Sequence, residues 1–228
     1  MAGIVGVLAA RAVVPRPERP DTAVMRIGLL LYEDVDVIDT GGPYEVFLTA
    51  SRLASRAGDD PPFDVVTLTP DGGPVTAYGG LGLIPQEAAS DPDLALDAVL
   101  VPGTIDIDAA AGDSDLMAAV RTLTAGAALT TSVCTGAFLL AEAGVLTGRP
   151  WTTHWEDVDD LAARLGSSGS PDGGARRGVR WVDDGEVVTS AGLASGIAMA
   201  LHLVDRFAGR ELAERTARQL DHPWSPDP

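Results

Sequence analysis

The chain has 228 residues, of which 46% are hydrophobic, so it can bury one core and is expected to form a single folded domain. Its 33 acidic against 16 basic residues give a formal net charge of -17, which repels phosphate backbones and anionic lipid surfaces. We therefore expect neither nucleic acid nor a membrane as a partner, and the single cysteine, which allows no internal disulfide, favours the reducing cytoplasm.

The two ends of the chain are expected to lie outside the fold. The stretch from Met1 to Ala10 is apolar but lacks the basic residues that begin a secretory signal, which leaves such a signal as the weaker alternative. We interpret residues 1–25 as a disordered extension, with Met25 as a second possible start, residues 26–222 as one domain, and residues 223–228 as a frayed tail.

Hydrophobic periodicity predicts strands that alternate with helices. In chain order, the expected elements are a strand at 26–32, a helix at 44–53, a strand at 63–68, a small edge hairpin at 74–85, a strand at 96–103, a helix at 116–125, a strand at 129–134, helices at 135–143 and 156–165, a hairpin at 179–188, and helices at 197–207 and 211–220. This alternation indicates a mainly parallel sheet covered by helices on both faces. Ligands of such folds bind at the carboxyl ends of the strands, where the strands ending at Tyr32, Gly103 and Cys134 come together.

Cys134 is expected at a turn from a buried strand into a helix. The N–H groups and the positive dipole end of that helix would favour thiolate over thiol, so we expect a lowered pKa for Cys134. Thr135 could donate its hydroxyl to the sulfur or cap the helix, and Gly136 would let the backbone approach a ligand closely. The alternative is that Cys134 is a small buried apolar residue with no chemical role.

A nucleophile needs an anion site and a proton carrier nearby. Gly103 and Thr104, at the tight turn after a neighbouring strand, could supply backbone N–H donors. Asp39 follows the apolar pair Val37-Ile38 and is expected to face the same crevice, where a carboxyl group beside a thiol can shuttle a proton. For Asp39 the alternative is an N-cap of the helix that contains Pro43.

Several short segments together make the chain recognisable: Ile-Gly-Leu-Leu-Leu-Tyr32, Asp39-Thr-Gly-Gly-Pro-Tyr-Glu-Val, Leu-Val-Pro-Gly103, Thr-Ser-Val-Cys134-Thr-Gly-Ala and Thr-Thr-His154-Trp. With these segments the chain, from Arg26 to Leu220, resembles the DJ-1/PfpI superfamily of class I glutamine amidotransferase-like proteins. The resemblance implies a flavodoxin-like α/β sandwich, usually a homodimer, with no cofactor. It also implies that Cys134 is a nucleophile on a sharp elbow, and that Gly103 and Thr104, with Gly42 and Gly136, line the substrate and anion site.

The neighbours of Cys134 narrow the resemblance further. Thr135 stands where the PfpI-type peptidases carry a histidine, and Asp39 stands where DJ-1 itself carries a glutamate. The chain therefore looks most like isocyanide (isonitrile) hydratases, enzymes of the lyase class, and like the N-terminal domains of AraC-type regulators. It departs from the family at Thr104, where a second glycine is usual, which is expected to reshape the pocket floor.

The hydratase resemblance implies that Cys134 attacks the terminal carbon of an isocyanide, that Asp39 serves as general acid and base, and that an N-substituted formamide is released. Two alternatives remain, a ligand or oxidative-stress sensor and a glyoxalase-like activity on small electrophiles. The scattered His154, His202 and His222 do not have the spacing of metal ligands, so no metal is expected. We interpret His154 as a hydrogen-bonded structural residue at a sheet edge or dimer contact.

Overall fold

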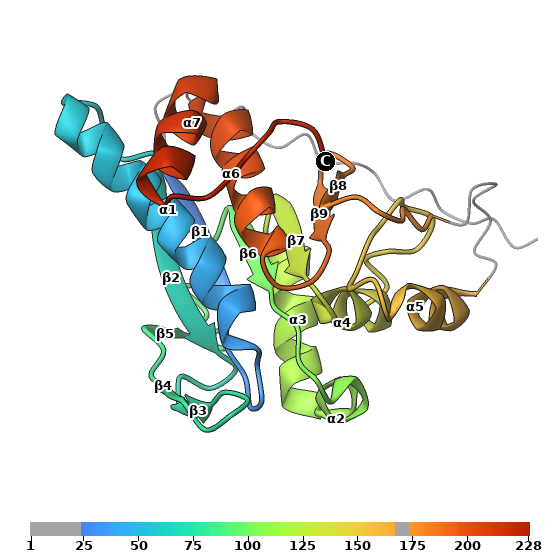
Figure 1. Ribbon diagram of the computed structural model, residues 1–228. Helices are drawn as coiled ribbons and strands as arrows, with labels where there is room; N and C mark the ends of the chain where they lie inside the picture. The colour runs from blue at the N-terminus through green and yellow to red at the C-terminus, as the bar shows by residue number, and fades with distance from the viewer. Residues whose placement is uncertain (1–23, 167–173) are drawn as a thin grey trace, which may run out of the picture.

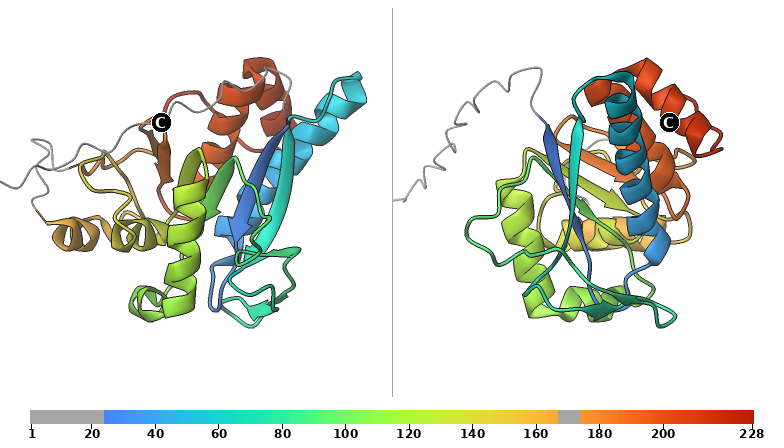
Figure 2. Two further views of the ribbon diagram at one scale, coloured as in Figure 1. Left: turned by 180° about the vertical axis from the view of Figure 1, so that it is seen from behind. Right: turned by 90° about the vertical axis from the view of Figure 1, so that its left-hand side faces the viewer.

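The computed structural model describes residues 24–166 and 174–228. In this part of the chain a seven-stranded sheet, in the order β5-β2-β1-β6-β7-β9-β8, lies between two layers of helices (Figures 1 and 2). The described pairs of neighbouring strands in this sheet are parallel except β8 with β9. The predicted α/β sandwich is therefore confirmed, whereas most of the expected extension at 1–25 lies outside the described residues.

The elements follow one another along the chain as strands and helices in near alternation. Their bounds are β1 Met25–Leu30, α1 Val37–Ala57, β2 Phe63–Thr69, β3 Val75–Thr76, β4 Gly82–Leu83, β5 Glu87–Ala88, β6 Ala98–Val101, α2 Ile107–Gly112, α3 Ser114–Gly126, β7 Leu129–Val133, α4 Gly136–Glu142, α5 Val158–Leu165, β8 Trp181–Asp183, β9 Val187–Ser190, α6 Ser195–Ala208 and α7 Arg210–Gln219.

The two faces of the sheet carry separate apolar clusters. On one face α1, α6 and α7 pack together, and their core includes Phe47 and Met199. On the other face α3, α4 and α5 enclose a second cluster that includes Phe138 and Trp151. The right-hand view of Figure 2 shows α1, α6 and α7 on one side of the sheet and α3 on the other. Burial on both faces explains the apolar runs of β1 and β6.

The strand register brings three strand ends to one level. Val101 of β6 pairs with Ser132 of β7, and Val133 of β7 pairs with Ser190 of β9. The loops that follow these strands therefore leave the sheet side by side, at the edge where parallel α/β folds bind ligands.

Helix α1 begins earlier than its sequence suggests. The prediction placed its start at Tyr44, after Pro43, but the helix starts at Val37 with Asp36 as its N-cap, and Pro43 lies inside it. Gly42 packs closely on α6, because a Cβ at this position would lie 2.8 Å from Cγ1 of Ile197. Such tertiary contacts offset the helix-breaking tendency of the Gly-Gly-Pro sequence.

Two short elements escaped prediction, and one was misplaced. The hairpin predicted at 74–85 forms, as β3 paired with β4, but it is a separate two-stranded sheet. The edge of the main sheet is instead β5, Glu87–Ala88, and α2 also forms where no helix was expected. Elements of two to six residues carry too few apolar positions to show a period.

The C-terminal residues 223–228 contain no helix or strand but are tied to the body of the protein. Nη2 of Arg180 donates to Oγ of Ser225 at 2.7 Å, and the guanidinium of Arg210 lies 5.6 Å from the ring of Trp224. None of the helices in the described residues is both long and apolar enough to cross a bilayer.

Replacing Gly136 by alanine is expected to destabilise the protein by about 3 kcal/mol or more, since such overlaps force backbone movement. A Cβ there would lie 2.2 Å from the carbonyl oxygen of Val101 and 2.7 Å from that of Pro102. The control is Gly41→Ala, a helical position with no atom within 4 Å of the added Cβ, which should gain about 0.5 to 1 kcal/mol. Urea unfolding followed by circular dichroism measures both, and equal midpoints for the two variants would contradict this account.

Candidate active site

Cys134 lies at the junction of β7 and α4, as its sequence context predicts. Its backbone is in the left-handed region, with φ of 57°, which a side chain with a Cβ adopts only when the surroundings force it. The N–H of Cys134 donates to the carbonyl oxygen of Ser190 at 3.2 Å, and its own carbonyl accepts from Oγ1 of Thr153 at 2.8 Å. The elbow is thus held from β9 and from the segment after α4.

Asp39 is brought to this elbow from the first turn of α1. Its side chain is fully buried, and Oδ2 accepts a hydrogen bond from the N–H of Gly103 at 3.1 Å. A Cβ at position 103 would lie 2.8 Å from that oxygen, so only glycine fits between β6 and the carboxyl group. The alternative role of Asp39 as N-cap is excluded, because Asp36 occupies that position.

Burial sets the protonation of the two groups. Desolvation, with the nearby charge of Asp36, raises the pKa of Asp39 to about 7, although Gly103, the Cys134 thiol and the N–H of Leu193 favour the carboxylate. Desolvation and the charge of Asp39 raise the pKa of Cys134 to about 12. The expected lowering of the thiol pKa is therefore wrong, because burial outweighs the N–H groups of Thr135 and Leu193 that favour its thiolate.

The pair is consequently a thiol beside a carboxyl group that can change its protonation near neutral pH. Oδ1 of Asp39 has no direct hydrogen-bond partner among the described residues, so it can carry the proton. Cys134 is buried, with 8% of the residue exposed. The arrangement suits a nucleophile that loses its proton as it reacts.

The predicted anion site is arranged differently. The N–H of Thr104 donates to Oγ1 of Thr135 at 2.8 Å, and that hydroxyl donates back to the carbonyl of Thr104 at 2.7 Å. With the N–H of Gly103 bonded to Asp39, neither predicted donor is free. Thr135 neither bonds the sulfur nor caps α4 through its side chain, but clamps the β6 turn to the elbow.

The other residues predicted to line the site also have packing roles. Gly136 is required by the close approach of α4 to the end of β6, and Gly42 by the packing of α1 on α6; their contact with a ligand stays a prediction. The side chain of Thr104 donates to the carbonyl of Asp34 at 2.8 Å, which ties the β6 turn to the loop before α1. This is the contact made by the residue that replaces the usual second glycine.

Leu193 is a functional position that the sequence did not indicate. Its φ is 53°, and its N–H favours the charged forms of both Asp39 and Cys134. A backbone donor leaves no trace in residue type, so only the segment Ala-Gly-Leu-Ala between β9 and α6 could have marked a tight turn.

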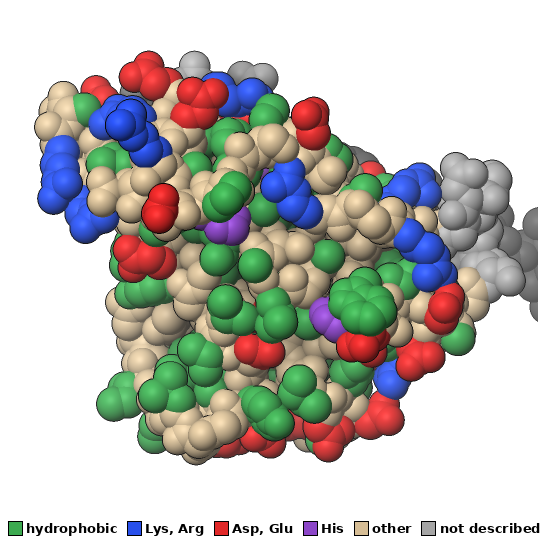
Figure 3. All heavy atoms as spheres, in the orientation of Figure 1, with side chains coloured by type: hydrophobic (Ala, Val, Ile, Leu, Met, Phe, Trp, Pro, Cys, Tyr) green, Lys and Arg blue, Asp and Glu red, His purple; other side chains and the backbone are tan. Residues whose placement is uncertain are grey.

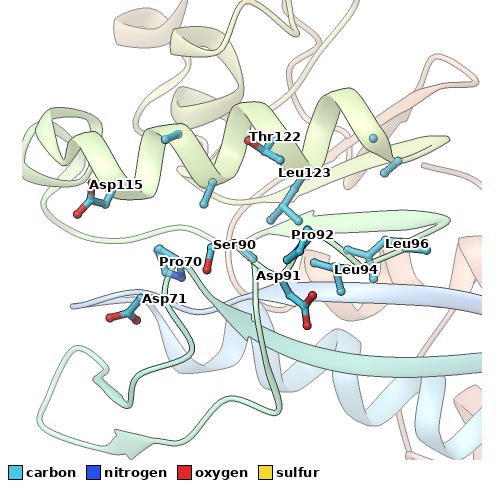
Figure 4. A pocket seen from close by; sticks show the side chains of 16 residues that line it. Pro70, Asp71, Ser90, Asp91, Pro92, Leu94, Leu96, Asp115, Thr122 and Leu123 are labelled. Atoms are coloured by element: carbon cyan, nitrogen blue, oxygen red, sulfur yellow. The ribbon is translucent and has the colours of Figure 1, made fainter.

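Large cavities lie away from this site. One of them has a volume of about 810 Å³. It lies between α3 and the segment that leads into β6, and residues such as Leu96, Asp115 and Leu123 line it (Figure 4). A second, of about 1030 Å³, borders Met25 and Arg206. Figure 3 shows hydrophobic side chains spread over the lower half of one face of the protein. Three exposed apolar residues belong to the site or follow or precede one of its residues in sequence. These residues are Ile38, Ile105 and Leu193.

His154 is held by acidic neighbours. Its Nδ1 lies 3.2 Å from Oδ2 of Asp157, and its side chain is 19% exposed. Among the described residues no group of three or more His, Cys, Asp or Glu side chains is arranged to hold a metal ion.

Comparisons with known proteins find a matching family and several relatives. The model of the DJ-1/PfpI family matches residues 25–206. The chain is 34% identical over 202 residues to the isonitrile hydratase of Pseudomonas putida, covering 89% of this chain and 80% of that one. It is 30% identical to the HTH-type transcriptional regulator GbdR of Pseudomonas aeruginosa, over 95% of this chain but 57% of the regulator. A THiJ/PfpI family protein from Pseudomonas syringae superposes with a TM-score of 0.74 at 27% identity, over 92% and 78% of the two chains.

Replacing Asp39 by asparagine should stabilise the protein increasingly as the pH rises. The pKa of Asp39 is about 7 in the folded protein, above the ordinary aspartate value of 3.8 that applies to the unfolded chain. The wild type therefore loses stability as the pH rises from the unfolded value through the folded pKa. Between pH 5 and pH 8 this loss amounts to roughly 2 to 3 kcal/mol, and asparagine, which keeps an oxygen for Gly103, does not incur it.

Thermal melts at both pH values measure the effect. The difference in Tm between variant and wild type should grow from pH 5 to pH 8 by about 2 to 4 °C per kcal/mol. Asp60→Asn, which removes one exposed charge, is the control and should give a constant difference. A constant difference for Asp39→Asn as well would contradict the assignment of a buried, neutral carboxyl group.

Proposed function

The chain belongs to the DJ-1/PfpI family, and from this premise we propose that it hydrates isocyanides to N-substituted formamides, with Cys134 as the nucleophile and Asp39 as the general acid and base. The similarity to an isonitrile hydratase over most of both chains supports this choice within the family. The observation that carries it is the fully buried carboxyl group of Asp39 beside the Cys134 thiol, with a pKa raised to about 7. A group that gains and loses a proton near neutral pH can serve both steps of a hydration.

In the first step the sulfur of Cys134 forms a bond to the terminal carbon of the isocyanide. The proton of the thiol, relayed by Asp39, ends on that same carbon, which gives a neutral thioimidate with a C=N bond. A thiol that is neutral at rest suits this step, because its proton is consumed by the reaction.

In the second step water adds to the thioimidate carbon. Asp39 takes a proton from the water and delivers it to the nitrogen, leaving a tetrahedral carbon bonded to oxygen, nitrogen and sulfur. The C–S bond then breaks as the C=O bond forms, and the hydroxyl proton returns to the sulfur. The sum is the addition of one water to the isocyanide, and both residues are regenerated.

A sensor is the second candidate, because the chain also resembles a transcriptional regulator. A thiol whose pKa is raised to about 12 holds little thiolate at neutral pH, which disfavours fast oxidation by peroxide. The buried carboxyl group is needed for proton transfer and not for ligand sensing. Hydration is therefore the function that this site supports best.

The test is conversion of p-nitrophenyl isocyanide to its formamide, followed by chromatography. Cys134→Ala should abolish turnover, and Asp39→Asn should lower kcat by about 100-fold to 10,000-fold, the usual contribution of a general acid or base. Asp60→Asn, an exposed position, should keep the wild-type rate. If wild-type protein forms no formamide while methylglyoxal is consumed, the hydratase proposal is wrong and a glyoxalase-like activity replaces it.

A further inference from the structure

The segment after α4 that contains the Thr-Thr-His-Trp sequence packs against β9 and against the backbone of Cys134. The N–H of Thr152 donates to Oγ1 of Thr189 in β9 at 2.9 Å. Oγ1 of Thr153 donates to the carbonyl of Cys134 at 2.8 Å, and both threonines are 1% exposed. This segment therefore has two direct attachments to the strands that support the site.

His154, the next residue, contacts the segment that follows β9. A Cβ built on Gly192 would lie 2.1 Å from Cδ2 of His154, so the ring occupies the space where any side chain at position 192 would be. The ring is oriented by Asp157, whose Oδ2 lies 3.2 Å from Nδ1 and whose N–H donates to the carbonyl of His154 at 3.0 Å. The ring thus has a fixed partner on one side and the backbone of Gly192 on the other.

Gly192 lies between Ala191, whose carbonyl accepts from the N–H of Cys134 at 3.3 Å, and Leu193, whose N–H favours the charged forms of Asp39 and Cys134. The turn continues into α6, because the N–H of Ser195 donates to the carbonyl of Gly192 at 3.2 Å. A displacement of Gly192 would therefore change the direction of the Leu193 N–H.

We propose that His154 is a positioning residue: its ring, held by Asp157, fixes the backbone of Gly192 and so directs the Leu193 N–H at the pair of Asp39 and Cys134. This inference rests on the proposed function only for the reaction that Asp39 and Cys134 catalyse, and not for the position of the Leu193 N–H. His154 acts on the pair through the backbone of Gly192.

Loss of the ring has a defined consequence for the pair. The charge of Asp36 raises the pKa of both Asp39 and Cys134, whereas the Leu193 N–H lowers both. Tyr32 also faces the pair, and burial together with the charges of Asp39, Cys134 and Asp36 raises its pKa well above the ordinary value. If that donor moves away, both Asp39 and Cys134 hold their protons to higher pH. The reactivity of the thiol then rises at a higher pH than in the wild type.

The test uses the fact that Cys134 is the single cysteine of the chain, so alkylation by iodoacetamide reports on this thiol alone. In full-length protein, His154→Ala should slow alkylation at pH 8 by about threefold to tenfold and shift the rate profile to higher pH, because a hydrogen bond to a charged group is weakened. His154→Phe keeps a ring against Gly192 and should stay closer to the wild type than His154→Ala does. His222→Ala, in the C-terminal segment, is the matched histidine control and should leave the profile unchanged.

Asp157→Asn provides a second, milder variant in case the alanine variant does not fold, and should shift the profile in the same direction by a smaller amount. Unchanged alkylation profiles in folded His154→Ala, or in Asp157→Asn if the former is unfolded, would overturn the proposal. In the hydration assay, His154→Ala should lower kcat with KM within about twofold, as expected for a positioning effect. A wild type that hydrates no isocyanide would refute the proposed function alone, because the alkylation profile needs no turnover.

Discussion

The hydrogen bond from the N–H of Gly103 to Oδ2 of Asp39 is the contact on which the site depends. It joins the first turn of α1 to the end of β6, which is paired with β7, the strand that leads into Cys134. The glycine is essential, since a Cβ there would overlap both Asp39 and the hydroxyl of Thr135. A fully buried carboxyl group is costly unless it is partnered or neutral, and here one oxygen is partnered while the other can hold a proton.

The same burial gives the pair its chemistry. In water, the thiol and the carboxyl group would titrate far from one another and the carboxylate would be permanently charged at neutral pH. Removal from solvent raises the pKa of both groups, so that the thiol stays protonated while the carboxyl group can gain or lose its proton near neutral pH. Backbone N–H groups of Thr135 and Leu193 are already in place when the thiolate forms.

The fold could be predicted from sequence because strands such as β1 and β6 are buried on both faces and are apolar runs that alternate with helical patterns. The places of Cys134 and Asp39 also followed, since strand ends of a parallel sheet meet at one edge. The hydrogen-bond partners could not be predicted. The N–H groups of Gly103 and Thr104 were expected to serve an anion, but in the structure they donate to Asp39 and Thr135. Leu193 contributes only its backbone, and the thiol pKa depends on burial, so neither could be predicted from residue types.

The reciprocal hydrogen bonds between Thr104 and Thr135 have a consequence for the kind of substrate that can react. Ester and amide cleavage place full negative charge on a carbonyl oxygen, which needs donors waiting at that position. Here the hydroxyl of Thr135 already accepts the hydrogen bond of the Thr104 N–H, a donor predicted for the anion site. This arrangement is in keeping with the proposed hydration, in which each new bond to carbon is matched by a proton and no full negative charge has to build up on an oxygen.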